Sequence, residues 1–167
     1  MFEKLDDVDW ASLEHAYGKA EDVPQMIRGL ASPDEEARDE AFYTAYGNIF
    51  HQGTRYEATA PAVPFLLEIL EQPDYHAHGE LMFYMSHLVM GFGEAYIPFG
   101  FSEVIRAMRE ALVDLRARPD SEREAEDGEG WGTDEDWLTW ITAITDEARK
   151  GVPRYIRFLG ADDERVS

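Results

Sequence analysis

An internal repeat with an offset of forty residues limits the fold of this chain more than any other feature. Segment 23–34 recurs as 63–74, with Val-Pro, Leu and Pro-Asp at the same offsets, and Val152-Pro153 followed by Leu159 resembles the start of a third copy. Each copy predicts a helix, a tight turn that opens on Pro-Asp, and a second, antiparallel helix. One such pair cannot bury its apolar face alone, so neighbouring pairs are expected to stack around a continuous core.

The spacing of apolar residues predicts helices along the whole chain. These residues recur three and four positions apart, and no segment shows the sustained period-two alternation of a half-buried strand. The first helix is expected after Asp9 and ends at Gly18. Ser32 is expected to cap the second helix of the first pair, with Pro33 in its first position and Glu35 completing a capping box. The apolar stripes lie in 10–17, 23–30, 37–49, 63–70, 81–89, 105–115 and 138–144, and a lone final helix is expected from Val152.

These patterns predict an all-α fold of about eight helices, arranged as antiparallel pairs in a short right-handed solenoid. The chain has 167 residues, of which 44% are hydrophobic and 13% aromatic, enough for one domain over 1–167. Segment 119–136 differs, because it holds nine acids, one base and three glycines, and it is expected to be an acidic flexible loop. The expected core comprises Trp10, Leu13, Ile27, Leu30, Phe42, Ile49, Val63, Leu66, Leu67, Leu70, Met82, Met85, Val89, Ile105, Met108, Leu112, Leu138, Ile141 and Ile156.

Two segments resemble a known family. Ser32 to Ala41, which reads SPDEEARDEA, resembles the inter-helix turn and second helix of a HEAT repeat, whose typical pair is an Asp after Pro and an Arg four residues later. Asn48 to Leu66 is similar to a segment of small bacterial HEAT-repeat proteins. The resemblance implies a HEAT-like α-solenoid. The second copy of the repeat departs from the family pattern, because His78 stands where an arginine is expected four residues after Asp74. The HEAT family includes scaffolds, transport receptors and a few enzymes, so it says little about function.

The charge of the chain excludes several function classes. There are 35 acidic and 15 basic residues, which gives a formal net charge of −20. Such a chain lacks the clustered bases that bind phosphate backbones or anionic lipids, and a basic protein is its electrostatic complement. The absence of cysteine excludes disulfides, thiol catalysis and thiolate metal sites. The first residues lack the pattern of a secretory signal, and a cytoplasmic protein is expected.

Three further patterns are weak candidates for chemistry. His76, His78 and His87 could bind a metal, but their spacing places no carboxylate beside them, and surface or capping roles are preferred. Gly91-Phe92-Gly93 fails the dinucleotide-binding fingerprint and is expected to end a helix. The aromatic residues between 92 and 101 are expected to be buried, and an exposed cluster would instead anchor a partner. No cofactor or metal is expected.

Segment 50–59 is rich in polar residues for a connector. A catalytic interpretation would make His51 a base oriented by Glu57, but no nucleophile or second acid accompanies them. The preferred interpretation is structural, with these side chains bonding to the exposed helix ends that flank the connector and Arg55 paired with Glu57 or a neighbouring acid. A binding role is the alternative.

The function expected from these observations is non-enzymatic protein binding through an acidic surface. One form of it is an immunity-type protein that neutralises a basic toxin. The alternatives are a nucleic-acid mimic that inhibits a DNA- or RNA-binding protein, and an enzyme on a HEAT scaffold. The residues expected to bind the partner are Asp34, Glu35, Glu36, Asp39, Glu40, His51, Gln52, Arg55, Tyr56 and Glu57.

Overall fold

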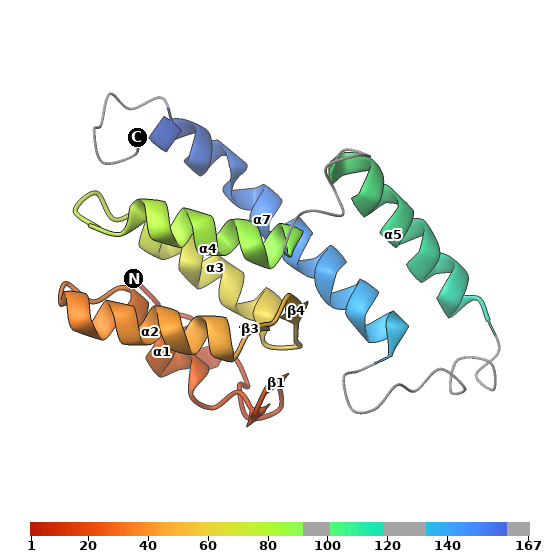
Figure 1. The fold of residues 1–167 in the computed structure, drawn as a ribbon, viewed down its shortest axis with the longest axis horizontal. Coiled ribbons are helices and arrows are strands. Elements are labelled where there is room, and N and C mark those ends of the chain that lie inside the picture. Colours follow the sequence, from red (N-terminus) through yellow and green to blue (C-terminus); the bar gives the residue numbers. More distant parts are fainter. Residues whose placement is uncertain (92–100, 119–132, 160–167) are drawn as a thin grey trace.

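The fold is mainly helical in the computed structural model, which describes residues 1–91, 101–118 and 133–159 (Figure 1). The helices of this part of the chain are α1 (Val23–Leu30), α2 (Glu35–Gly47), α3 (Thr59–Leu70), α4 (His78–Met90), α5 (Phe101–Arg116) and α7 (Asp134–Leu159), after a short 3-10 helix at Leu5–Asp7. Two antiparallel hairpins pair β1 (Glu14–His15) with β2 (Gly18–Lys19) and β3 (Phe50–His51) with β4 (Thr54–Arg55). The predicted mainly helical architecture is confirmed, whereas the hairpins are not among the predicted elements.

The helix expected from Trp10 to Gly18 is wrong. The apolar stripe lies on turns and on the β1–β2 hairpin, because a segment this short gains too few backbone hydrogen bonds to repay helix nucleation. The Trp10 indole N–H instead donates to the Leu5 carbonyl oxygen at 2.7 Å, and both side chains are buried. Gly18 has a φ of 119°, a left-handed conformation that suits glycine.

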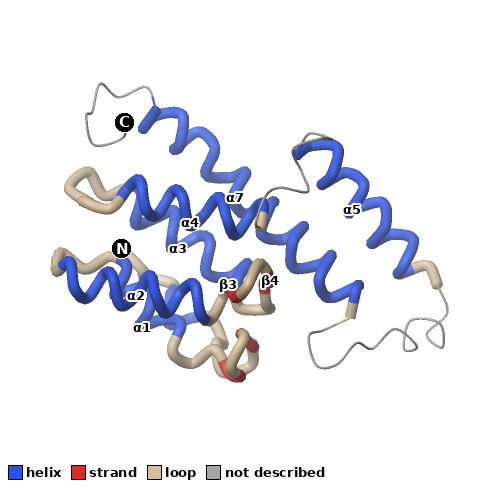
Figure 2. The backbone as a smooth tube through the Cα atoms, in the orientation of Figure 1, coloured by secondary structure: helices blue, strands red, loops and turns tan. Residues whose placement is uncertain are grey.

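Each helical pair is preceded by a hairpin, so the structural unit is larger than the sequence repeat suggests. The order hairpin, helix, helix occurs as β1-β2-α1-α2 and again as β3-β4-α3-α4. The strands of both hairpins lie at one end of these four helices (Figure 2). The Tyr17 and His51 rings meet edge-on at 5.5 Å, and the Ala16 N–H donates to the Asn48 carbonyl oxygen at 3.2 Å. The two hairpins therefore contact each other.

Helix α3 is the centre of the core. Its residues are apolar on nearly every side, and eight of its twelve residues are buried, as expected for a helix surrounded by protein. It contacts α1, α4 and α7, and α5 packs on the other side of α7. Helices α2 and α4 lie over α1 and α3 (Figure 1). This arrangement leaves the outer faces of α2 and α4 exposed.

Most of the expected core is buried. The residues confirmed as buried are Trp10, Ile27, Leu30, Ile49, Val63, Leu66, Leu67, Leu70, Met85, Ile105, Leu112, Leu138 and Ile141. Leu13, Phe42, Met82, Val89 and Met108 are only partly buried. The side chains of Ile156 and Phe101 and the aromatic residues of 92–100 lie outside what the structure describes.

The C-terminal helix, α7, differs from the predicted boundaries at two places. Val152-Pro153 lies inside α7 and does not open a separate capping helix, so that prediction is wrong. The loop predicted at 119–136 ends earlier, because α7 begins at Asp134. Thr133 and Asp136 form its cap: Thr133 Oγ1 accepts from the Asp136 N–H at 3.2 Å, and the Asp136 carboxylate accepts from the Thr133 N–H at 2.9 Å. Residues 119–132 lie outside the described part of the chain.

Candidate functional site

The N-terminus of α2 holds the first group of predicted partner-binding residues. Asp34, and not Ser32, is the N-cap, because its carboxylate accepts from the Ala37 N–H at 2.9 Å. Ser32 Oγ accepts from the Asp34 N–H at 3.1 Å and so supports that cap. Glu35 and Glu36 follow in the first turn, where negative charge complements the helix dipole. These three acids have a local structural role and are all exposed.

Further along α2, exposed acids lie next to an exposed aromatic ring. Asp39 and Glu40 are exposed, and Tyr43 is 84% exposed one helical turn beyond them. On α4, Glu80 is exposed and Phe83 is 62% exposed. Glu80 and Phe83 correspond to Glu40 and Tyr43 at the repeat offset of forty residues. We call the six residues Glu36, Asp39, Glu40, Tyr43, Glu80 and Phe83 the α2–α4 face.

The α2–α4 face rests on a well-packed seam between the two helices. The Tyr84 hydroxyl of α4 is fully buried and donates to the Ala45 carbonyl oxygen of α2 at 3.0 Å. Tyr84 also meets the Phe42 and Tyr46 rings edge-on at 6.3 and 4.7 Å. The Tyr46 hydroxyl bonds to Nδ1 of His87 at 3.0 Å. These contacts hold α2 and α4 in a fixed relation, so their exposed side chains form a preorganised surface.

Sequence reasoning missed half of this face. Tyr43, Glu80 and Phe83 are absent from the predicted partner-binding residues, although the forty-residue offset pairs Tyr43 with Phe83. The available signal is an aromatic residue at the same repeat position in both copies. Both positions lie outside the buried apolar stripes of their helices. An aromatic residue that recurs at such a position therefore indicates an exposed surface.

The β3–β4 hairpin holds the second predicted group of binding residues. Its turn is Gln52-Gly53, with φ values of 50° and 90°, as required by a type I′ turn. Gln52 is exposed and His51 is half-buried. Glu57 follows the hairpin, and its carboxylate accepts from the Glu14 N–H at 3.2 Å, which ties the two hairpins together.

Arg55 is buried and binds the end of α4. Only 2% of it is exposed, and its guanidinium donates to the carbonyl oxygens of Leu88 at 2.8 Å, Val89 at 3.0 Å and Gly53 at 3.2 Å. The expectation that this segment bonds to the helix ends that flank it is wrong for Arg55, because Arg55 bonds to the end of α4, which does not flank the segment. Glu57, one of the acids expected to pair with Arg55, accepts a hydrogen bond from the Glu14 N–H. A charged donor on the last carbonyls of a helix also complements the helix dipole.

Tyr56 is buried as well, so neither Arg55 nor Tyr56 presents a surface to a partner in this conformation. The Tyr56 ring packs 6.4 Å from that of Trp140 on α7. Burial raises the pKa of its hydroxyl, and the nearby Tyr17 raises it further. Of the predicted residues in this segment, His51, Gln52 and Glu57 therefore remain accessible, at the end of helices α1 to α4 where the two hairpins contact each other (Figure 2).

The histidines do not gather into a metal site. His78 is buried and its Nε2 lies 3.2 Å from the Leu70 carbonyl oxygen, while His87 bonds to Tyr46 and His76 is exposed. Within 1–91, 101–118 and 133–159, no group of three or more histidines and acids could hold a metal ion. Gly91 ends α4, as expected, with a φ of 68°.

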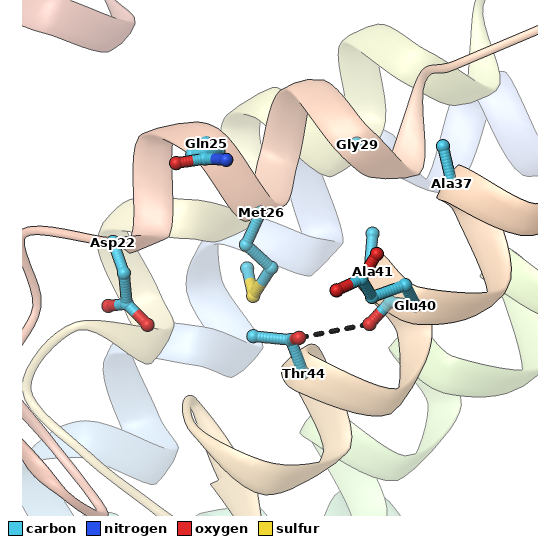
Figure 3. A pocket seen from close by; sticks show the side chains of 8 residues that line it. All are labelled: Asp22, Gln25, Met26, Gly29, Ala37, Glu40, Ala41 and Thr44. Atoms are coloured by element: carbon cyan, nitrogen blue, oxygen red, sulfur yellow. Dashed lines mark hydrogen bonds between the residues drawn. The ribbon is translucent and has the colours of Figure 1, made fainter.

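A pocket of about 260 Å³ lies between α1 and α2 (Figure 3). Carboxylates stand on both sides of it, Asp22 at the start of α1 and Glu40 on α2, and Met26 lies between them. The helices approach closely at its inner end, because a Cβ on Gly29 would lie 2.8 Å from the Ala41 Cβ. The lining residues are Asp22, Gln25, Met26, Gly29, Ala37, Glu40, Ala41 and Thr44.

Comparisons with known proteins identify no relative. No family model matches the chain, and no match was found among curated proteins or solved structures. No helix in the described residues is long and apolar enough to cross a membrane. The function is therefore inferred from the geometry of this chain alone.

Proposed function

We propose that this chain is a non-enzymatic binding module that recognises a basic protein through the α2–α4 face. The observation that carries the proposal is the repeated pair of an exposed acid and an exposed ring, Glu40 with Tyr43 and Glu80 with Phe83, on two adjacent helices. Carboxylates attract lysine and arginine, and aromatic rings bind both the aliphatic stems and the cations of these side chains. Aromatic residues also contribute strongly to protein interfaces.

The net charge of −20 supports a basic partner in particular. A charge of this size raises the association rate with an oppositely charged protein and opposes binding to DNA, RNA or anionic lipid. An immunity-type protein that neutralises a basic toxin is one form of this function. We prefer the immunity-type form to a nucleic-acid mimic, because on α2 and α4 the exposed acids lie beside large exposed aromatic rings, which a phosphate backbone does not resemble.

We further propose that the two hairpin-helix-helix units are HEAT-like units of a short α-solenoid. Supporting this, α1 and α3 lie in one layer and α2 and α4 in the next (Figure 1). At the position of the typical HEAT arginine, Arg38 is buried and donates to the carbonyl oxygens of Ser32 and Pro33 at 3.0 and 2.9 Å. Its counterpart His78 bonds to the Leu70 carbonyl oxygen, at the end of the preceding helix. Both side chains therefore hold the turn of their pair.

The experiment is capture of partners from a lysate of the native host at low and at moderate salt, followed by mass spectrometry. The proposal predicts a basic protein that is retained at low salt and is progressively lost as salt screens the acids. A retained protein that is acidic, or whose capture does not depend on salt, would contradict the proposal. A toxin-like reading frame directly upstream of the gene would favour the immunity-type form.

A further inference from the structure

The pocket between α1 and α2 is too small for a typical small-molecule ligand but suited to one side chain. Pockets that enclose drug-sized ligands usually measure about 300–1,000 Å³, whereas this one measures about 260 Å³. Its floor is formed by Met26, Gly29 and Ala41, and its rim carries Asp22 and Glu40 (Figure 3). An apolar floor with carboxylates at the rim is complementary to a side chain that has an aliphatic stem and a cationic head.

The two carboxylates differ in how they are held. Asp22 is fixed, because Nε2 of His15 lies 2.8 Å from one carboxylate oxygen and the Asn48 amide donates to the other at 2.5 Å. His15 Nδ1 accepts from the Tyr17 N–H at 3.0 Å, so in the neutral ring Nε2 carries the proton that Asp22 accepts. Each carboxylate oxygen has two lone pairs, so Asp22 keeps acceptor capacity for a ligand.

Glu40 is exposed, and among the described residues its carboxylate has no hydrogen-bond or ion-pair partner. The basic residues of the neighbouring helices are engaged elsewhere. Arg28 of α1 binds the Asp6 carboxylate at 2.6 and 2.8 Å, and Arg38 of α2 binds the carbonyls of the α1–α2 turn. The negative charge at the pocket rim is therefore not neutralised by these arginines.

We propose that this pocket receives an arginine side chain of the basic partner, with its stem against Met26 and its guanidinium at the rim, where it pairs with Glu40 and is attracted by Asp22. Arginine fits better than lysine, because its planar head carries five donors and can bind one carboxylate through two parallel hydrogen bonds, whereas an ammonium acts as a point charge. This inference rests on the proposed function and deepens it, since it names the anchor residue that the partner inserts beside the α2–α4 face.

The test is an NMR titration of the ¹⁵N-labelled full chain with Nα-acetyl-L-arginine amide, which requires no knowledge of the partner. The matched probe is the citrulline compound, which has the same shape without the charge, and the lysine compound is the third probe. We expect saturable shift changes in the Gly29, Ala41 and Thr44 amides with arginine, binding several-fold weaker with lysine, and no saturation with citrulline.

Two variants and one control locate the binding. Glu40→Gln removes a rim charge from an exposed position and should weaken arginine binding about tenfold, which corresponds to one charge-assisted hydrogen bond. Thr44→Met should block the pocket sterically, at the loss of only a hydrogen bond within α2. The control Glu110→Gln changes an exposed acid of α5, outside both the pocket and the α2–α4 face, and should leave arginine binding unchanged.

Equal binding of arginine and citrulline, shift changes that map away from α1 and α2, or an unchanged affinity in Glu40→Gln would overturn the pocket assignment. These results would not by themselves contradict the α2–α4 face, because that surface is tested with a protein partner and also includes Tyr43, Glu80 and Phe83, which do not line the pocket. Conversely, arginine binding in the pocket combined with salt-independent capture of partners would retain the pocket and contradict the proposed function.

Discussion

Tyr43 and Phe83 occupy the same position in the two helical pairs, and both rings face outward on adjacent helices, with 84% and 62% of their surface exposed. The residues one turn earlier, Glu40 and Glu80, are exposed acids. Neither ring belongs to the buried core. Large exposed rings promote association, so a pair of them at matched positions supports the proposed binding role.

Arg55 is expected to be the most important polar residue for stability. Arg55→Met keeps much of the apolar stem but leaves the carbonyls of Leu88 and Val89 without their charged donor, which should lower the free energy of unfolding by about 1.5–3 kcal/mol. Arg28→Met is the matched control, because Arg28 makes an exposed ion pair with Asp6 that should contribute at most about 1 kcal/mol. Urea denaturation of both variants measures the difference. Equal effects would contradict the capping role of Arg55.

Gly91 should tolerate no side chain, for two reasons. Its φ of 68° is unfavourable for other residues, and an added Cβ would lie 3.0 Å from Nη1 of Arg55. Gly91→Ala is expected to destabilise the chain by about 1–3 kcal/mol from the backbone alone, because a φ of 68° with a ψ of −147° is a conformation that is essentially restricted to glycine. Gly79→Ala is the control: this exposed residue lies in the first turn of α4, an added Cβ there would have nothing within 4 Å, and the substitution should stabilise by up to about 1 kcal/mol. Thermal unfolding compares the two variants, and a stabilised Gly91→Ala would show the geometry of this cap to be wrong.

Removing the hydroxyl should change the free energy of unfolding differently for two buried tyrosines. Tyr84→Phe removes the hydrogen bond to the Ala45 carbonyl and should cost about 1 kcal/mol. The Tyr75 hydroxyl is buried and has no hydrogen-bond partner among the described residues, so Tyr75→Phe should be neutral or stabilising. Chemical denaturation at neutral pH measures both variants. A large loss of stability in Tyr75→Phe would indicate that its hydroxyl is bonded after all.

The same tyrosines predict a loss of stability at alkaline pH. Burial raises the pKa of Tyr84 and Tyr75 in the folded state; for Tyr75, Arg38 lowers the value and Glu80 raises it to smaller extents. Above pH ~10 the unfolded chain releases these protons while the folded chain keeps them, so the free energy of unfolding falls by up to about 1.4 kcal/mol per pH unit for each tyrosine. The stability is fully present below that pH and is lost as the pH rises toward the raised values.

Denaturation between pH 8 and pH 11 measures this slope. Each Tyr→Phe variant should be less pH-dependent than the unmodified chain, because one linked proton has been removed. A slope that is unchanged in both variants would show that neither tyrosine is responsible for the alkaline loss.

The sequence predicts the parts of the fold that follow from periodicity. The helices of both pairs lie where the apolar stripes place them, since each stripe is long enough to bury one helical face against a neighbour. It does not predict the hairpins, because strands of two residues carry no alternation to detect and depend on turns such as Gln52-Gly53. The sequence also predicts a local partner for Arg55, yet its partners in α4 lie more than thirty residues away. Such contacts depend on tertiary packing, which local sequence patterns do not contain.

The candidate site, like the fold, is predictable from the sequence only in part. The exposed acids of α2 are predictable, because charged residues opposite an apolar stripe face solvent. The accessibility of the individual residues in segment 50–59 is not predictable from the sequence. The β3–β4 hairpin turns Arg55 inward and leaves Glu57 exposed, and the difference in burial depends on this hairpin alone.

The central claim is tested most directly by the rate at which the captured basic protein associates with variants of the full chain. The binding variant carries Glu40→Gln, Tyr43→Ala, Glu80→Gln and Phe83→Ala. The control carries Glu110→Gln, Val113→Ala and Asp114→Asn, which change exposed acids and an exposed apolar residue on α5. Both sets lie on the surface, so thermal unfolding should show both variants folded.

Stopped-flow or surface-plasmon measurements at two salt concentrations give the rates. We predict that the binding variant associates at least about tenfold more slowly than the unmodified chain at low salt, with a weaker salt dependence, and that the control keeps most of the original rate. Equal rates for the binding variant and the unmodified chain at both salt concentrations would contradict recognition through the α2–α4 face.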